Sequence, residues 1–321
     1  LGMVLAAFMG GLLAQTVIFS LASLLFILIL FYVAVRLNAR FGLYEPPAIT
    51  VSRGVYAPRV GFLGKLGFSS LEAAIIRKDF KAFTRRRELM YIFIMPIVFI
   101  IMPLLSSIRG TAGAPLPSAF YPFLFAYLTL LPGTVMAISL GNIIIGSEGE
   151  SVWYFYSFPI SAKSLVKAKY FFATLVGFAI ALVCFFVSVL LTSPSMKMAT
   201  TGLVEAILLV FSLGMVSLTF GIEGADFREL PRPRMIRPMW ALLNGIVCLL
   251  LALAIVSPMI PYGLKILFRD ILAPLAISIS LPESYLYVAL LLSGVIAFVV
   301  TYVFHRMAVR NAEKLLLKAE E

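Results

Sequence analysis

The sequence predicts an all-α polytopic membrane protein with about seven transmembrane helices. Of its 321 residues, 62% are apolar and 13% are charged, whereas a soluble domain is about half apolar and about a quarter charged. The apolar residues also form long runs, and a helix of about 20 apolar residues spans the bilayer core. Seven runs are long enough: residues 11–35, 89–108, 119–145, 170–192, 203–222, 239–262 and 285–304.

Lysine and arginine are concentrated in alternate segments between these runs. With residues 36–88 in the cytoplasm and each run crossing the membrane once, 22 of the 26 Lys and Arg lie on the cytoplasmic side. Cytoplasmic loops of membrane proteins carry such an excess. We therefore expect a plasma-membrane protein with the N-terminus of this chain outside and its C-terminus in the cytoplasm. The basic segments would contact anionic lipid heads, so the net charge of +11 does not indicate nucleic-acid binding.

The first run, within residues 1–36, is separated from the others by residues 37–68. These are rich in proline and glycine and have no helical period, which is typical of a linker. The chain begins with Leu1 and has no signal-peptide pattern, so we expect the first run to end an N-terminal half of a longer chain. Residues 89–310 then form the main membrane core, and residues 311–321 form a cytoplasmic tail.

Residues 69–88 predict an amphipathic helix before the second run. Ser69 and Glu72 match a capping box, which marks a helix start. Apolar side chains fall near one face of this helix and basic ones lie elsewhere, which suits a helix in the inner headgroup layer. A soluble helix packed on other protein is the alternative.

Residues 146–169 form a segment that starts polar, is aromatic in its middle and ends basic. Large aromatic side chains provide contact area at protein interfaces with little loss of side-chain entropy. We therefore expect residues 148–161 to dock a protein partner, and an aromatic belt at the inner membrane surface is the alternative. Three lysines near its end would face an acidic partner surface or lipid heads: Lys163, Lys167 and Lys169.

Other polar features of the runs predict helix packing. Asn142 and Asn244 are expected to hydrogen-bond across helix contacts.

Residues 263–284 are too apolar for an ordinary outer loop, and charged residues interrupt them too often for a span. This segment predicts one or two short re-entrant helices in the outer leaflet.

The sequence offers little for catalysis. It has one histidine, His305, and no P-loop motif, so His-based metal sites, triad catalysis and ATP binding by this chain are not expected. Glu205 lies near the outer end of the fifth run and Glu223 follows its inner end, and both are expected at the membrane interface and not in a proton relay. We therefore expect no enzyme activity and no cofactor in this chain. A separate ATPase, with its own ATP and Mg, would supply the energy.

Residues 71–310 resemble the permease subunits of type-2 ABC exporters, the ABC-2 family. The sequence KDFKAFTRRREL at 78–89 is similar to the basic elbow helix before their first span. Residues 146–169, with EG followed by FPISAKSLVKAK, are similar to their first cytoplasmic loop, whose coupling helix docks on the ATPase. The sequence GADFRELPRPR at 224–234 is similar to their second cytoplasmic loop.

The resemblance implies that the second to seventh runs form the six-span transmembrane subunit of an ATP-driven exporter, working by alternating access. The implied partners are a P-loop ATPase, a second permease half or a second copy of this chain, and membrane lipids. The implied coupling residues are Glu148, Gly149, Trp153, Phe155, Pro159, Ile160, Ser161, Asp226, Phe227 and Arg228. The implied elbow-helix residues are Lys78, Asp79, Phe80, Arg85, Arg86 and Arg87. An ion-coupled secondary transporter and a non-transport membrane scaffold are the alternatives.

Overall fold

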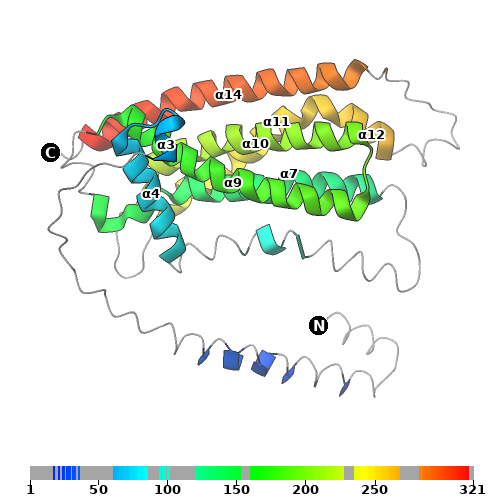
Figure 1. Ribbon diagram of the computed structural model, residues 1–321, viewed down its shortest axis with the longest axis horizontal. Helices are drawn as coiled ribbons and strands as arrows, with labels where there is room; N and C mark the ends of the chain where they lie inside the picture. The colour runs from blue at the N-terminus through cyan, green and yellow to red at the C-terminus, as the bar shows by residue number, and fades with distance from the viewer. Residues whose placement is uncertain are drawn as a thin grey trace, which may run out of the picture. The chain divides into compact units, whose positions relative to one another are not determined.

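The chain divides into two compact units, Leu1–Ala57 and Pro58–Glu321. The described residues of the first unit are all helical, lie within residues 17–36 and overlap the first predicted run. Those of the second unit form a helical bundle (Figure 1). The computed structural model describes residues 61–85, 120–152, 160–227, 235–267, 282 and 284–317, and single residues within 17–36 and 94–101.

Five long helices make up the described bundle, and helices adjacent in the chain run antiparallel (Figure 1). They are α7 (Phe120–Ile143), α9 (Ala162–Thr192), α10 (Met196–Glu223), α11 (Pro238–Val256) and α14 (Ser284–Leu317). The shorter described elements are α3 (Phe62–Lys65), α4 (Ser70–Arg85), η2 (Gly146–Val152), η3 (Ser257–Met259) and α12 (Ile260–Leu267).

Five described helices are long and apolar enough to cross a membrane. They confirm the third to seventh predicted runs and the all-α polytopic class, whereas the first two runs lie largely outside the described residues. The five are Tyr121–Ile143, Ala162–Thr192, Met196–Glu223, Pro238–Gly263 and Ser284–Leu317. Helix α9 begins at Ala162, well before residue 170 where its run was predicted to start, because Ser161 caps it and accepts a hydrogen bond from the Ser164 N–H at 3.2 Å.

Helix α10 lies against α7, α9, α11 and α14 and so forms the centre of the bundle. Small residues set the closest approach. Gly141 of α7 faces the backbone of α10, and a Cβ atom there would lie 2.9 Å from the Gly214 carbonyl oxygen. Membrane helices pack tightly through such small residues, because lipid provides no hydrophobic force to press them together.

Hydrogen bonds also link helices at the centre of the bundle. The Ser217 hydroxyl of α10 donates to the Ile138 carbonyl of α7. The side-chain amide of Asn244 donates in turn to the Ser217 hydroxyl oxygen at 2.9 Å, so the predicted role of Asn244 is confirmed. For Asn142 the side-chain oxygen has no hydrogen-bond partner among the described residues.

Helix α4 begins with the predicted capping box. The Ser69 N–H donates to Glu72 Oε2 at 2.9 Å, and the Glu72 N–H donates to Ser69 Oγ at 3.2 Å. The apolar side chains Ile75 and Ile76 are buried in a cluster with Ala168 of α9. The apolar face of α4 therefore packs on protein of the same chain, as in the alternative that the sequence left open.

The described end of the predicted linker is structured. Residues 61–68 form α3 and a turn in which Gly67 adopts a φ of 78°, a conformation that glycine reaches without strain. The Phe68 N–H donates back to the Leu63 carbonyl at 3.2 Å, and the Phe68 ring lies 4.6 Å from that of Phe171 in α9. These contacts hold α3 against the bundle.

The predicted outer segment, residues 263–284, is described at its beginning. Helix α12 covers Ile260–Leu267 and continues from α11 through η3. Residues 268–281 lie outside the described part. Of the predicted segment, α12 contains only residues 263–267, so the short re-entrant helices stay a prediction.

We predict that Gly141→Ala destabilises the bundle, because the added methyl group must push α7 and α10 apart. Overpacking of this kind costs about 1–3 kcal/mol. The control is Gly245→Ala in α11, where an added Cβ meets nothing within 4 Å. Thermal unfolding midpoints of the detergent-solubilised chain should fall for the first variant and stay unchanged or rise for the second. Equal midpoints would contradict tight packing at Gly141.

Candidate functional site at the basic end of the bundle

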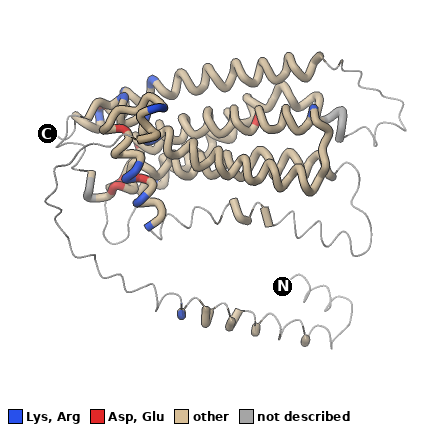
Figure 2. Tube along the Cα trace, viewed as in Figure 1, with Lys and Arg blue, Asp and Glu red and all other residues tan. Residues whose placement is uncertain are grey.

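The described lysine and arginine residues of the bundle gather at one end of it (Figure 2). This basic end is where α7, α10 and α14 finish and where α9 and α11 begin. Lys197, at the start of α10, lies at the other end. The positive-inside rule assigns the basic end to the cytoplasm, and that orientation stays a prediction.

Four charged side chains from three elements meet at the basic end. Lys169, in the third turn of α9, donates from Nζ to Asp79 Oδ1 of α4 at 2.8 Å and to Glu148 Oε1 of η2. Lys78 of α4 donates to the second oxygen of Glu148. We call these four residues the ion-pair cluster.

The cluster is buried where it joins the three elements. The Lys169 side chain is 0% exposed, and those of Asp79 and Glu148 are each 6% exposed. Taking an ammonium group out of water costs several kcal/mol, which close carboxylates offset only in good geometry. Removing one partner of such a pair leaves a buried, uncompensated charge and costs about 3–5 kcal/mol. The cluster therefore fixes α4, η2 and α9 relative to one another.

The two carboxylates of the cluster differ in the direction in which their pKa values are shifted. Burial raises the pKa of Glu148, but the ammonium groups of Lys169 and Lys78 outweigh burial and leave that pKa below its ordinary value. For Asp79, burial outweighs the attraction of Lys169, and its pKa lies above the ordinary value. Asp79 Oδ2 also has no hydrogen-bond partner among the described residues. Glu148 is thus the firmly charged carboxylate, and Asp79 is the one that takes up a proton more readily.

A second, more exposed ion pair lies beside the cluster. Lys167 Nζ is 3.1 Å from Glu72 Oε2 and donates to the Gly67 carbonyl at 2.8 Å. The same ammonium group lies 4.7 Å from the centre of the Phe68 ring. Because Lys167 is half exposed, solvent screens this pair and its contribution is about 1 kcal/mol or less. It ties α9 to the turn between α3 and α4.

The structure places four of the predicted coupling residues of the first loop. Glu148 points into the ion-pair cluster, and Gly149 follows it with a φ of 56° that favours glycine. Ile160 packs beside α4, and Ser161 caps α9. Trp153, Phe155 and Pro159 lie outside the described residues, so docking by this loop stays a prediction.

The second loop lies directly against the first. A Cβ on Gly146, at the start of η2, would overlap the Met235 carbonyl oxygen, so these two backbones touch. Asp226 donates its N–H to the same carbonyl at 3.4 Å, and Phe227 packs against the core of the bundle. The last predicted coupling residue, Arg228, lies outside the described residues.

The predicted elbow residues that the structure describes have different surroundings. Lys78 and Asp79 belong to the ion-pair cluster. The Phe80 ring meets the edge of Phe172 in α9, with centroids 4.8 Å apart. Arg85 is exposed at the end of α4. Arg86 and Arg87 lie outside the described residues.

The prediction for Lys169 was wrong, because it does not face a partner or lipid. The sequence contained one indication of this: Leu165 and Ala173, four residues before and after Lys169, are both apolar. The structure shows both fully buried. Residues four apart share a helix face, so Lys169 lies on the buried face of α9. Its partners could not be read from the sequence, since they lie on other elements.

Glu205 is also not where the sequence placed it. It is 3% exposed, inside the bundle, and neither carboxylate oxygen has a hydrogen-bond partner among the described residues. Ser293 of α14 lies near it and donates its hydroxyl to the Ile255 carbonyl at 2.7 Å. Glu223, by contrast, is exposed at the basic end. The described residues contain no group of His, Cys, Asp and Glu that could hold a metal ion.

Glu72 predicts a pH dependence. Burial raises its pKa, but the Ser69 N–H and Lys167 outweigh burial and leave it below the ordinary value of 4.5. The folded chain therefore binds this proton less readily than the unfolded chain, and Glu72 stabilises the fold above pH 4.5 but loses that contribution as pH falls through its lower, folded pKa.

We therefore predict that Glu72→Gln, which preserves a capping side chain, lowers the thermal unfolding midpoint at neutral pH by an amount equivalent to about 1 kcal/mol or less. The difference from wild type should disappear in acid. The exposed Glu223→Gln is the control and should show little difference at any pH. A difference for Glu72→Gln that grows in acid would contradict the pairing.

Comparison with known proteins corrects the expected family. A family model described as "Membrane protein of 12 TMs" matches residues 5–306. No curated protein and no solved structure matches the chain. The resemblance to ABC-2 permeases was wrong, because it depended on short patterns that also have local structural causes in this chain. The match covers most of the sequence, and the chain belongs to this family of twelve-span membrane proteins.

Proposed function

We propose that this chain is a transport subunit of the plasma membrane whose spans are moved by a separate partner acting on the basic end of the bundle. The observation that carries the proposal is the ion-pair cluster. Through Lys169 it joins a helix long enough to span the membrane to two shorter segments, α4 and η2. The chain has no P-loop, so the partner would supply the energy.

The cluster provides a route for force between the first loop and two spans. Element η2 follows α7 directly in the chain, and the Glu148–Lys169 pair holds η2 to α9. A displacement of the loop is passed to both helices, because separating a buried ion pair is costly. Packed interfaces respond to such displacements by switching between discrete arrangements, as alternating access requires.

Contact between the two loops extends this route. Because Gly146 lies against the Met235 backbone, a force on either loop reaches the other. The segment after Met235 leads directly into α11. The basic end therefore couples three spans, α7, α9 and α11, to one surface.

We expect the partner to be a P-loop ATPase that binds ATP and Mg, while this chain carries no catalytic site or cofactor. Trp153 and Phe155 would be its contact residues, on the side of the basic end that the charge distribution assigns to the cytoplasm. Substrate would pass beside a second membrane half or a second copy of this chain. The twelve spans in the family description support such a pairing.

The test purifies tagged wild-type chain, Lys169→Met and Lys197→Met from native membranes with their associated proteins. Lys197 is an exposed lysine at the other end of the bundle, so it controls for lost charge. We expect wild type and Lys197→Met to co-purify with a P-loop ATPase and vanadate-sensitive hydrolysis. Lys169→Met should lose about tenfold of that hydrolysis, because Asp79 then loses its ammonium partner, Glu148 keeps only Lys78, and no ion pair holds η2 to α9.

A wild-type preparation without a nucleotide-hydrolysing protein would contradict the proposal, as would full hydrolysis with Lys169→Met. If Lys169→Met fails to fold, the triple variant Lys169→Met with Asp79→Asn and Glu148→Gln removes all three buried charges together. Such replacements are often tolerated. The triple variant should fold, bind the partner and still show reduced hydrolysis.

Glu205 favours a second candidate, an ion-coupled secondary transporter. A carboxyl group inside a membrane span is costly and commonly marks an ion or proton pathway. Glu205 meets this description, since it is buried in α10 and its oxygens have no hydrogen-bond partner within the described residues.

This candidate predicts proton flux without ATP. Proteoliposomes containing the purified chain and a pH-sensitive dye should show flux under an imposed membrane potential, and Glu205→Gln should reduce it at least about tenfold, since the carboxyl group that binds the proton is gone. The exposed Glu223→Gln is the control. Equal flux in Glu205→Gln and wild type, or none in wild type, would exclude the candidate.

A further inference from the structure

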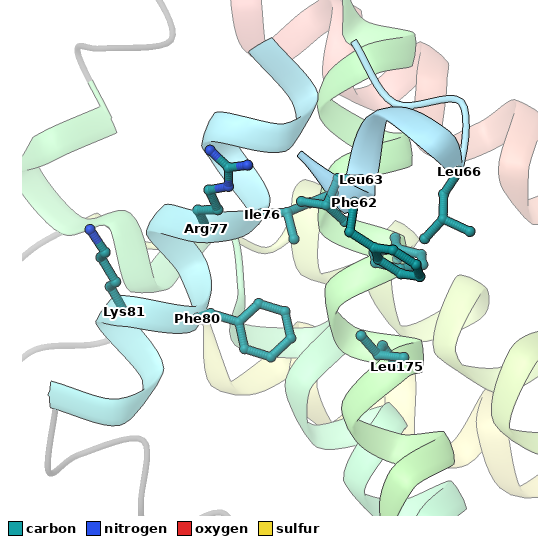
Figure 3. Close-up of a pocket in the computed structure, with 9 residues that line it drawn as sticks. Phe62, Leu63, Leu66, Ile76, Arg77, Phe80, Lys81 and Leu175 are labelled. Carbon is teal, nitrogen blue, oxygen red and sulfur yellow. The ribbon is translucent and has the colours of Figure 1, made fainter. Parts of the chain in front are cut away.

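A groove of about 460 Å³ lies between α3, α4 and α9 (Figure 3). This volume falls in the usual range of ligand sites, about 300–1,000 Å³. Apolar side chains line it, and Phe62 at its edge is 73% exposed. In Figure 3, Phe62 of α3, Leu66 directly after it, Phe80 of α4 and Leu175 of α9 lie around one space. Large apolar side chains left open around a groove indicate an apolar occupant.

Basic side chains border the same groove on α4. Arg77 and Lys81 are among its lining residues, and Figure 3 shows both directed away from the apolar side chains. Arg85 follows after four more residues, and residues four apart lie along one side of a helix. Lys65 lies in the last turn of α3. The groove therefore combines an apolar floor with a positively charged border.

We propose that the groove binds an anionic phospholipid, with its acyl chains against Phe62, Phe80 and Leu175 and its phosphate near Arg77 and Lys81. The floor matches hydrocarbon, and the border matches negative charge. Each Lys or Arg close to an anionic lipid surface contributes about 1 kcal/mol. A zwitterionic lipid fits less well, because its own cationic group would lie against the same basic border.

The groove fits a lipid better than a peptide. An extended peptide would bring unpaired backbone N–H and C=O groups into a space lined almost entirely by apolar side chains. Buried backbone groups without partners cost about 1–3 kcal/mol each. Acyl chains carry no such groups. The site also lies beside spans, where lipid is the surrounding solvent.

The test places the full chain in nanodiscs of equal parts phosphatidylcholine and phosphatidylglycerol and measures retained lipid by native mass spectrometry. Wild type should retain phosphatidylglycerol about tenfold over phosphatidylcholine, since two basic side chains favour it. Arg77→Gln with Lys81→Gln should lose that preference but still retain lipid. Leu175→Trp, which fills the groove, should retain neither lipid. Leu190→Trp is the control, because Leu190 is 82% exposed on the same helix and far along it.

Three results would overturn the proposal. The first is equal retention of both lipids by wild type. The second is Leu175→Trp retaining as much lipid as Leu190→Trp. The third is a lipid-free dimer that Leu175→Trp disrupts, since the groove would then hold a second copy of the chain. Thermal unfolding of each variant confirms that it is folded, and added salt should weaken phosphatidylglycerol retention alone.

Discussion

The burial of one ammonium group, that of Lys169, determines how the basic end of this protein is built. The group is fully enclosed, so it is stable only if carboxylates reach it without water between them. Asp79 comes from α4, whose apolar face also packs on α9, and Glu148 comes from η2. The cluster thereby converts three separate segments into one structural unit.

Lys169 and Glu205 show two outcomes for a charge inside the same bundle. Lys169 forms ion pairs with two carboxylates. Separating these buried pairs costs several kcal/mol, so Lys169 can hold the elements together mechanically. Neither carboxylate oxygen of Glu205 has a hydrogen-bond partner within the described part of the chain, so no local interaction offsets the free-energy cost of burying this group. A buried carboxyl group of this kind in a membrane span commonly marks an ion or proton pathway. This difference separates the partner-driven proposal from the ion-coupled one.

The helices were predictable because the bilayer fixes their length and composition, so each can be read locally. The capping box of Ser69 and Glu72 is local in the same way. The pairings were not predictable, since Lys169 meets residues 90 and 21 positions away. Helix α3 was missed because four residues are too few to show a period. Sequence reasoning treated charge near a span end as exposed, and packing placed Lys169 inside.

The mistaken family follows from the same physics. An amphipathic helix with basic residues before a span satisfies the chemistry of the membrane surface, whatever the protein does. In the first loop, Gly149 has a positive φ and Glu148 neutralises a buried lysine, so both have structural reasons to be there. Residues that meet a local constraint recur in unrelated proteins that share the constraint. A short motif identifies a family only when its residues lack such a local role, and the described residues of this motif have one.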